Sequence, residues 1–148
     1  MDGRAIVDTG YLVALLNGND AHHEWAAGLV PALRGPWVTA EACVSETIFL
    51  IEECGPAALD RLLSWLGRGL LLSQHALPER LDEVTAELRG YSGRWVDLAD
   101  ACIVCLSDES PNLPVASVDV SDFAVYFRQR RGRRLLLPAS KASRGGRR

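Results

Sequence analysis

The stretch Ala5-Ile-Val-Asp-Thr-Gly-Tyr-Leu-Val-Ala-Leu-Leu16 decides the fold of this chain. Its first three residues are small or β-branched and apolar, which is typical of a short buried strand. Asp8, Thr9 and Gly10 then turn the chain, and the apolar run from 11 to 16 predicts a helix. The stretch is a strand–turn–helix unit, and it places an acid at the carboxyl end of the strand.

Strands and helices alternate along the rest of the chain. The pattern predicts further strands at residues 37–39, 70–73, 114–118 and 135–137, and further helices at 22–34, 40–54, 56–66, 78–88, 97–108 and 120–129. This alternation is typical of an α/β fold with three α/β/α layers and a mainly parallel central sheet. Functional sites in such folds lie beyond the carboxyl ends of the strands. Asp8 and Asp119 are both expected there.

Length and composition narrow the class of protein. The chain has 148 residues, of which 48% are hydrophobic, so it fits one domain with a substantial core. No apolar run approaches the roughly 20 residues of a membrane span. The opening Met1-Asp2-Gly3-Arg4 does not resemble a signal peptide. We therefore expect a cytoplasmic protein with no membrane contact.

Cysteine and lysine usage excludes several kinds of site. Cys102 and Cys105 lie within an apolar helical run, and no second close pair completes a tetrahedral zinc site. We predict buried, reduced thiols. The single lysine, Lys141, lies near the C-terminus, which argues against Schiff-base chemistry and P-loop phosphate binding.

Charge is distributed very unevenly. Residues 1–127 contain 7 basic and 19 acidic side chains, whereas residues 128–148 contain nine basic and no acidic ones. The basic segment could be a solvated tail, or a mobile cationic arm that holds a polyanion such as RNA. We expect a domain over residues 1–138 and a basic, flexible tail over residues 139–148.

Six acids stand where apolar runs end or helices begin: Asp8, Glu46, Asp97, Asp100, Asp119 and Asp122. Each has a structural explanation when it is taken alone. Asp8 and Asp97 could cap helices, and capping is the favoured role of Asp122. Asp119 could be a turn residue, and Glu46 could face solvent.

Taken together, these acids indicate a site for a hard cation. Clustered carboxylates repel one another unless a positive charge joins them. Mg²⁺ and Mn²⁺ prefer carboxylate and water oxygens. Such an ion activates water as a nucleophile and neutralises charge on phosphorus. The basic segment suggests a matching substrate, a phosphodiester.

Four segments resemble the PIN-domain family, and in particular the VapC toxins of bacterial VapBC toxin–antitoxin modules. The opening unit with Asp8 resembles the first acidic segment of the family and is followed by Asp20-x-His22-His23, which is also common there. Ser45-Glu46, Leu98-Ala-Asp-Ala-Cys-Ile-Val104 and Ser117-Val-Asp-Val-Ser-Asp-Phe123 resemble the second, third and fourth. The match runs from about residue 5 to 138. Gly10 departs from the pattern, because the family often has Ser there.

The resemblance implies a PIN fold and a Mg²⁺- or Mn²⁺-dependent endoribonuclease that hydrolyses RNA by metal-activated water. The catalytic, metal-binding acids of the family fall on Asp8, Glu46, Asp100 and Asp119. Asp97, Asp122, Thr9 and Ser117 are then auxiliary residues of the site. The resemblance also implies a homodimer and a cognate VapB-like antitoxin, whose C-terminal segment crosses the acidic groove. Trp25, Trp65 and Phe49 are candidates for such contacts, although core packing is the favoured role of each when it is taken alone.

Two other functions stay open. The acids could form a docking surface for a partner in a non-catalytic PIN-like module, or the nuclease could act in RNA processing rather than as a toxin. An aspartate-based phosphotransferase also has an acid after its first strand. It needs a second Asp two residues later and a helper lysine, and this chain has Gly10 and no lysine in the domain. Neither the RNA that is cut nor the number of metal ions follows from the sequence.

Overall fold

The computed structural model of the chain describes residues 4–74, 76–90 and 94–139. Its strands are β1 (Ala5–Val7), β2 (Trp37–Ala40), β3 (Leu71–Gln74), β4 (Val115–Ala116) and β5 (Leu135–Leu136). Its α-helices are α1 (Thr9–Leu16), α2 (His23–Leu29), α3 (Glu41–Leu50), α4 (Pro56–Gly67), α5 (Ala76–Glu79), α6 (Leu81–Leu88), α7 (Leu98–Glu109) and α8 (Val120–Tyr126), with a 3₁₀ turn, η1, at Glu52–Cys54. The expected alternation of strands and helices is confirmed.

The five strands form one sheet in the order β3-β2-β1-β4-β5. Every pairing in it is parallel, and Ile6 of β1 lies between Val38 of β2 and Val115 of β4. The carboxyl ends of all strands therefore face the same edge. β1 and β4 are neighbours at the centre, so the residues that follow them are brought together at that edge.

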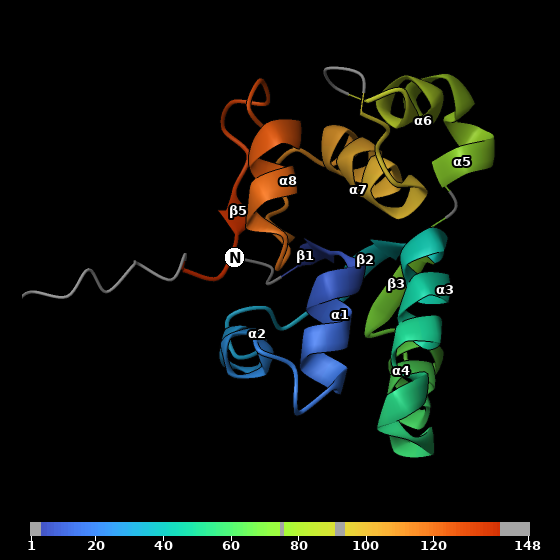
Figure 1. Cartoon of the computed structure of the whole chain (residues 1–148), viewed down its shortest axis with the longest axis vertical. Helices are drawn as coiled ribbons and strands as arrows, with labels where there is room; N and C mark the ends of the chain where they lie inside the picture. Colours follow the sequence, from blue (N-terminus) through green and yellow to red (C-terminus); the bar gives the residue numbers. More distant parts are fainter. Residues whose placement is uncertain (1–3, 75, 91–93, 140–148) are drawn as a thin grey trace, which may run out of the picture.

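Helices cover both faces of the sheet, because successive strand side chains point in opposite directions. Ile6 packs into a core with α6, α7 and α8, whereas Ala5 and Val7 pack with α1, α2 and α4. Figure 1 shows the sheet between these two groups of helices. The three-layer α/β/α architecture is confirmed.

Four predicted helices differ from those observed. The helix expected over residues 40–54 ends at Leu50 and is followed by η1, and the helix expected over residues 120–129 ends at Tyr126. The helix expected over residues 22–34 ends at Leu29, two residues before Pro31. Pro31 offers no N–H for a helical hydrogen bond, and Val30, although its backbone angles are still helical, donates to the Ala27 carbonyl in a tighter turn. The helix expected over residues 78–88 is divided into α5 and α6 at Arg80, whose backbone has φ −132° and ψ 40°.

The expectation of buried thiols holds for three of the four cysteines, and Cys54 is only partly buried. All four cysteines are free thiols, and Cys43, Cys102 and Cys105 are buried. Across residues 4–74, 76–90 and 94–139, no helix combines the length and apolar character needed to cross a bilayer.

Candidate active site

Asp8 is a buried acid held by two hydrogen bonds at the carboxyl end of β1. Its side chain caps α1, because Oδ1 accepts from the Tyr11 N–H at 2.9 Å, and Oδ2 accepts from the Ser117 hydroxyl at 2.5 Å. Only 4% of the residue is exposed. Burial raises the pKa of Asp8 from 3.8 to about 6, although these hydrogen bonds oppose the rise, and the charges of Asp119 and Glu46 add to it.

Asp119 follows β4 and caps α8. Its Oδ1 accepts from the Asp122 N–H at 3.0 Å, and its own N–H donates to the Ser117 hydroxyl at 3.0 Å. The expectation that Asp122 caps this helix is therefore wrong. β4 ends at Ala116, and α8 begins early enough for Asp119 to take the capping position. Ser117 links the two strand ends, because its oxygen contacts both Asp8 and Asp119.

Asp100 lies in the first turn of α7, three residues after the capping residue Asp97. Asp97 caps the helix by accepting from the N–H groups of Ala99 and Asp100, as the sequence predicts. The Tyr126 hydroxyl donates to Asp100 Oδ2 at 3.2 Å. Burial raises the pKa of Asp100 from 3.8 to about 7, and the charges of Asp97, Asp8 and Asp119 raise it further against the effect of Tyr126.

Carboxylate oxygens of Asp100, Asp119 and Asp122 lie within 4.8 Å of one another. Oxygen ligands at about 2.1 Å from one Mg²⁺ are separated by no more than about 4.2 Å, so small side-chain shifts would let all three bind the same ion. The donor set contains only oxygen, which suits a hard cation. The pKa of Asp122 is raised, first by its hydrogen bond with Asp119 and by burial, and the charge of Arg94 opposes the rise. These residues fit a divalent ion.

Glu46 borders this cluster from α3. The Thr9 hydroxyl donates to Glu46 Oε2 at 3.4 Å. Burial and the charge of Asp97 raise the pKa of Glu46, while Thr9 opposes the rise. The six sequence-predicted acids thus lie at one edge of the sheet, but the tightest group includes Asp122 and omits Asp8 and Glu46. The catalytic and metal-binding roles of Asp8, Glu46, Asp100 and Asp119 stay predictions.

The comparisons with known proteins agree with this geometry. The family model of the PIN domain matches residues 5–125 of the chain. This chain belongs to the PIN-domain family. No curated protein matches it. It resembles the crystal structure of Mycobacterium tuberculosis VapC20, a toxin that cleaves the sarcin–ricin loop, with a TM-score of 0.68 and 22% identity over 81% of this chain and 93% of that chain. The likeness shows a VapC-like PIN fold.

The PIN site of this chain uses Gly10 where a side chain would not fit. A Cβ atom built on Gly10 would lie 2.5 Å from Cγ2 of Val118. Val118 follows Ser117, so its methyl group fills the space that a residue-10 side chain would occupy. Glycine at position 10, where the family often has Ser, therefore leaves room for the Val118 side chain.

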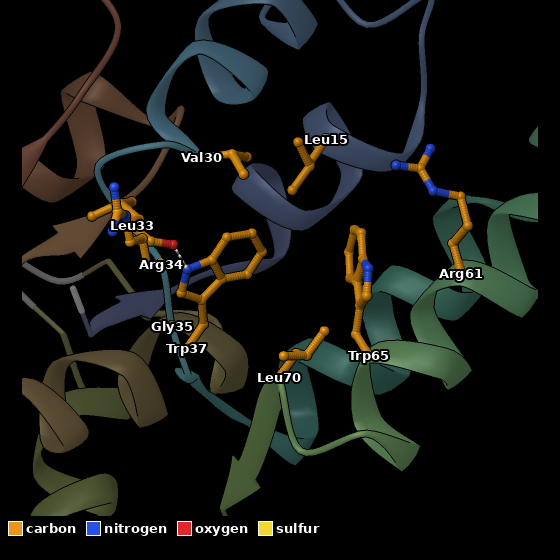
Figure 2. A pocket seen from close by; sticks show the side chains of 9 residues that line it. All are labelled: Leu15, Val30, Leu33, Arg34, Gly35, Trp37, Arg61, Trp65 and Leu70. Carbon is orange, nitrogen blue, oxygen red and sulfur yellow. Dashed lines mark hydrogen bonds between the residues drawn. The ribbon is translucent and has the colours of Figure 1, made fainter. Parts of the chain in front are cut away.

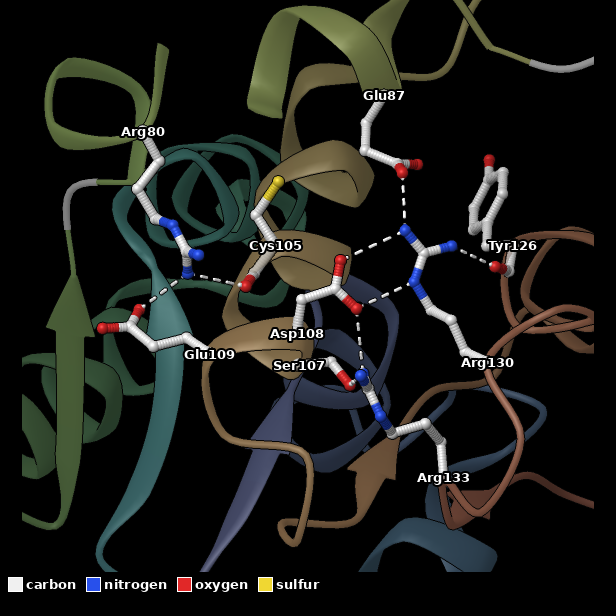
Figure 3. Close-up of polar contacts among 9 residues, drawn as sticks. All are labelled: Arg80, Glu87, Cys105, Ser107, Asp108, Glu109, Tyr126, Arg130 and Arg133. Carbon is white, nitrogen blue, oxygen red and sulfur yellow. Dashed lines mark hydrogen bonds and ion pairs between the residues drawn. The ribbon is translucent and has the colours of Figure 1, made fainter. Parts of the chain in front are cut away.

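Sequence reasoning missed Tyr126 and the ion-pair network that holds its helix. Arg130 donates to the Tyr126 carbonyl oxygen at 2.6 Å and pairs with Glu87 and Asp108, and Arg133 pairs with Asp108 at 3.0 Å (Figure 3). Burial favours a higher pKa for Asp108, but the two guanidinium groups outweigh it and lower that pKa. Arg130 and Arg133 thus belong to the folded domain and not to a mobile arm. Residues 140–148 lie outside the described residues.

A cavity of about 410 Å³ lies at the opposite edge of the sheet, where β2 and β3 begin. Figure 2 shows the indoles of Trp37 and Trp65 in it, together with Leu15 and Leu70. No acid of the described chain lines it. It is therefore separate from the PIN site. Of the aromatics considered for partner contacts, Trp25 and Trp65 pack against other rings, whereas Phe49 is 74% exposed.

Proposed function

We propose that this chain is an endoribonuclease that depends on Mg²⁺ or Mn²⁺. The observation that carries the proposal is the gathering of six acids at the carboxyl edge of β1 and β4. Burial and mutual repulsion raise the pKa of Asp8 and of Asp100, so these groups are costly to keep ionised. A protein retains such a cluster for chemistry more readily than for stability. Membership of the PIN-domain family supports a nuclease.

The side chains of the cluster have distinct parts in this proposal. Asp8, Glu46, Asp100 and Asp119 bind the ion or the water around it, and Asp122 adds an oxygen. A bound divalent ion would supply Lewis acidity toward a phosphodiester and a water molecule. Ser117 holds Asp8 in place and favours its ionised form. Thr9 orients Glu46, and Tyr126 orients Asp100.

Cleavage of total bacterial RNA by the purified chain tests the proposal. We expect cleavage with Mn²⁺ or Mg²⁺ that stops with EDTA and is lost in Asp100→Asn and Asp119→Asn. Asp82→Asn is the matched control, because Asp82 is exposed on α6. Retained cleavage in either site variant, with circular dichroism showing an intact fold, would refute the assignment. Mapping the cut ends would identify the RNA.

We also propose that the chain is the toxin of a type II toxin–antitoxin pair and forms a homodimer. The VapC-like fold supports this, since VapC20 is a toxin. Induced expression in a bacterial host should arrest growth, and Asp119→Asn should relieve the arrest. Co-expression with the small reading frame next to its gene should also relieve it, if that frame encodes the VapB-like antitoxin. Active nuclease without growth arrest would favour a role in RNA processing, and light scattering would report the dimer.

A further inference from the structure

Trp95 is a large apolar side chain displayed to solvent by a fixed backbone. It is 90% exposed, more than any other large apolar residue in the described parts of the chain. The backbone after it is held, because the Val96 N–H donates to the Leu88 carbonyl at 3.1 Å and the Val96 side chain is only 5% exposed. Asp97 then caps α7. The indole is therefore exposed directly before a residue that the fold holds in place.

The position of Trp95 connects it with the acid cluster. A cavity of about 50 Å³ is lined by Trp95 and Arg94 on one side and by Asp122 and Tyr126 on the other. Tyr126 contacts Asp100, and Asp122 contacts Asp119. A flat aromatic face and a guanidinium group thus stand beside the carboxylates. Arg94 is also close enough for its charge to act on Asp122.

This pairing of groups matches one nucleotide of an unpaired RNA strand. Such a nucleotide offers a flat base and a phosphate anion. Bases stack on aromatic side chains whatever their sequence, and the guanidinium group of arginine binds phosphate. A paired base has its faces covered by its neighbours in the helix, so only an unpaired segment could use both groups.

We infer that Trp95 stacks on an unpaired base next to the cleaved bond, while Arg94 binds a backbone phosphate. The inference rests on the proposed nuclease function and adds two residues that would contact its RNA substrate beside the acids, Trp95 and Arg94. The attraction of Arg94 also offsets part of the repulsion between the phosphates and the six acids. Without a cation at the rim, the acidic surface would repel the strand that it is meant to receive.

Kinetics with Mn²⁺ on an RNA oligonucleotide, single-stranded or annealed to its complement, test the inference. We expect Trp95→Ala to raise KM for the single strand by roughly tenfold to a hundredfold, with a smaller change in kcat. Trp95→Phe should restore part of the loss, because it keeps an aromatic face, and Trp95→Leu should not. Leu63→Ala is the control, since Leu63 is exposed on α4 and absent from the Trp95 cavity. An unchanged KM in Trp95→Ala, or equal cleavage of the duplex, would overturn the inference.

Arg94 and fluorescence give independent measurements. Arg94→Ala should reduce the slope of log KM against log salt by about 0.7, the value for one phosphate contact on a single strand. In an Asp119→Asn background, adding the RNA should quench tryptophan emission, and Trp95→Phe should abolish the quenching. Wild-type cleavage without quenching would refute stacking and leave the nuclease standing. Quenching without cleavage by the wild-type protein would support stacking and refute the nuclease function. If Trp95→Ala instead dissociates a dimer in light scattering, Trp95 belongs to a protein interface and the inference fails.

Discussion

Replacing Asp8 with asparagine should stabilise the metal-free protein at alkaline pH. A folded-state pKa near 6, against an ordinary 3.8, means that the folded protein binds a proton more tightly at Asp8 than the unfolded chain does. Stability therefore falls as pH rises from about 4 to above 6. This difference in pKa corresponds to about 3 kcal/mol in the free energy of unfolding. That contribution is present while Asp8 is protonated in the folded protein, and it is lost in full at pH 8.

Asparagine can keep the contacts of Asp8 without its charge. Its Oδ1 can still accept from the Tyr11 N–H, and its amide can donate to Ser117, whose hydroxyl now donates to Asp8. Any loss of stability caused by an imperfect fit of the asparagine side chain is the same at every pH. The informative quantity is therefore the change in the stability difference between Asp8→Asn and wild type across pH, rather than its value at one pH.

Urea unfolding in EDTA at pH 4, 5, 6, 7 and 8 measures that change. The stability of Asp8→Asn relative to wild type should rise by about 2.4 kcal/mol from pH 4 to pH 8. Asp60→Asn, exposed on α4, is the control and should show no such trend. A difference that stays constant with pH would show that Asp8 has an ordinary pKa. The account of a strained acid cluster would then be wrong.

Three further changes test the surroundings of the site. Ser117→Ala removes a donor that favours ionised Asp8, so its pKa should rise, and RNA cleavage should fall more at pH 6 than at pH 8 in a pH–rate profile. Gly10→Ser should cost about 1–3 kcal/mol in urea unfolding because of the close contact with Val118, and much less in a Val118→Ala background. Arg130→Gln should cost roughly 2–3 kcal/mol because it removes the half-buried charge that pairs with both Glu87 and Asp108, and equal stability of variant and wild type would contradict this.

The fold was predictable because its signals are local. Each strand is a short apolar run that ends at a turn or an acid, and parallel order follows from the helices between strands. The errors arose where two local signals competed. Near residue 120, both Asp119 and Asp122 are good capping residues, and the start of α8 at Val120 gives the capping position to Asp119. At the end of α2, the apolar pattern continued while Pro31 had already ended the helix.

The candidate site was less predictable because it depends on packing between distant elements. The sequence indicates which acids stand at element ends, but not that Asp122 approaches Asp100 and Asp119 more closely than Asp8 does. It also gives no sign of Tyr126, whose contact with Asp100 depends on how α8 lies against α7. The sequence shows that Gly10 departs from the family pattern. Only the structure shows that Val118 occupies the space that a side chain at residue 10 would need.

The same carboxylates connect stability with metal binding. Asp8 and Asp100 receive donors from Tyr11, Ser117 and Tyr126, yet the pKa of each acid remains raised, so these neutral donors compensate only part of the charge. A bound divalent ion would complete the compensation, and it would have to displace protons from both acids below about pH 7. Metal binding should therefore weaken as pH falls, while the metal-free protein becomes more stable. The stabilisation that Mn²⁺ gives should consequently be larger at pH 8 than at pH 5. Acids that served only to stabilise the fold would not show these opposite pH trends in metal binding and in the stability of the metal-free protein.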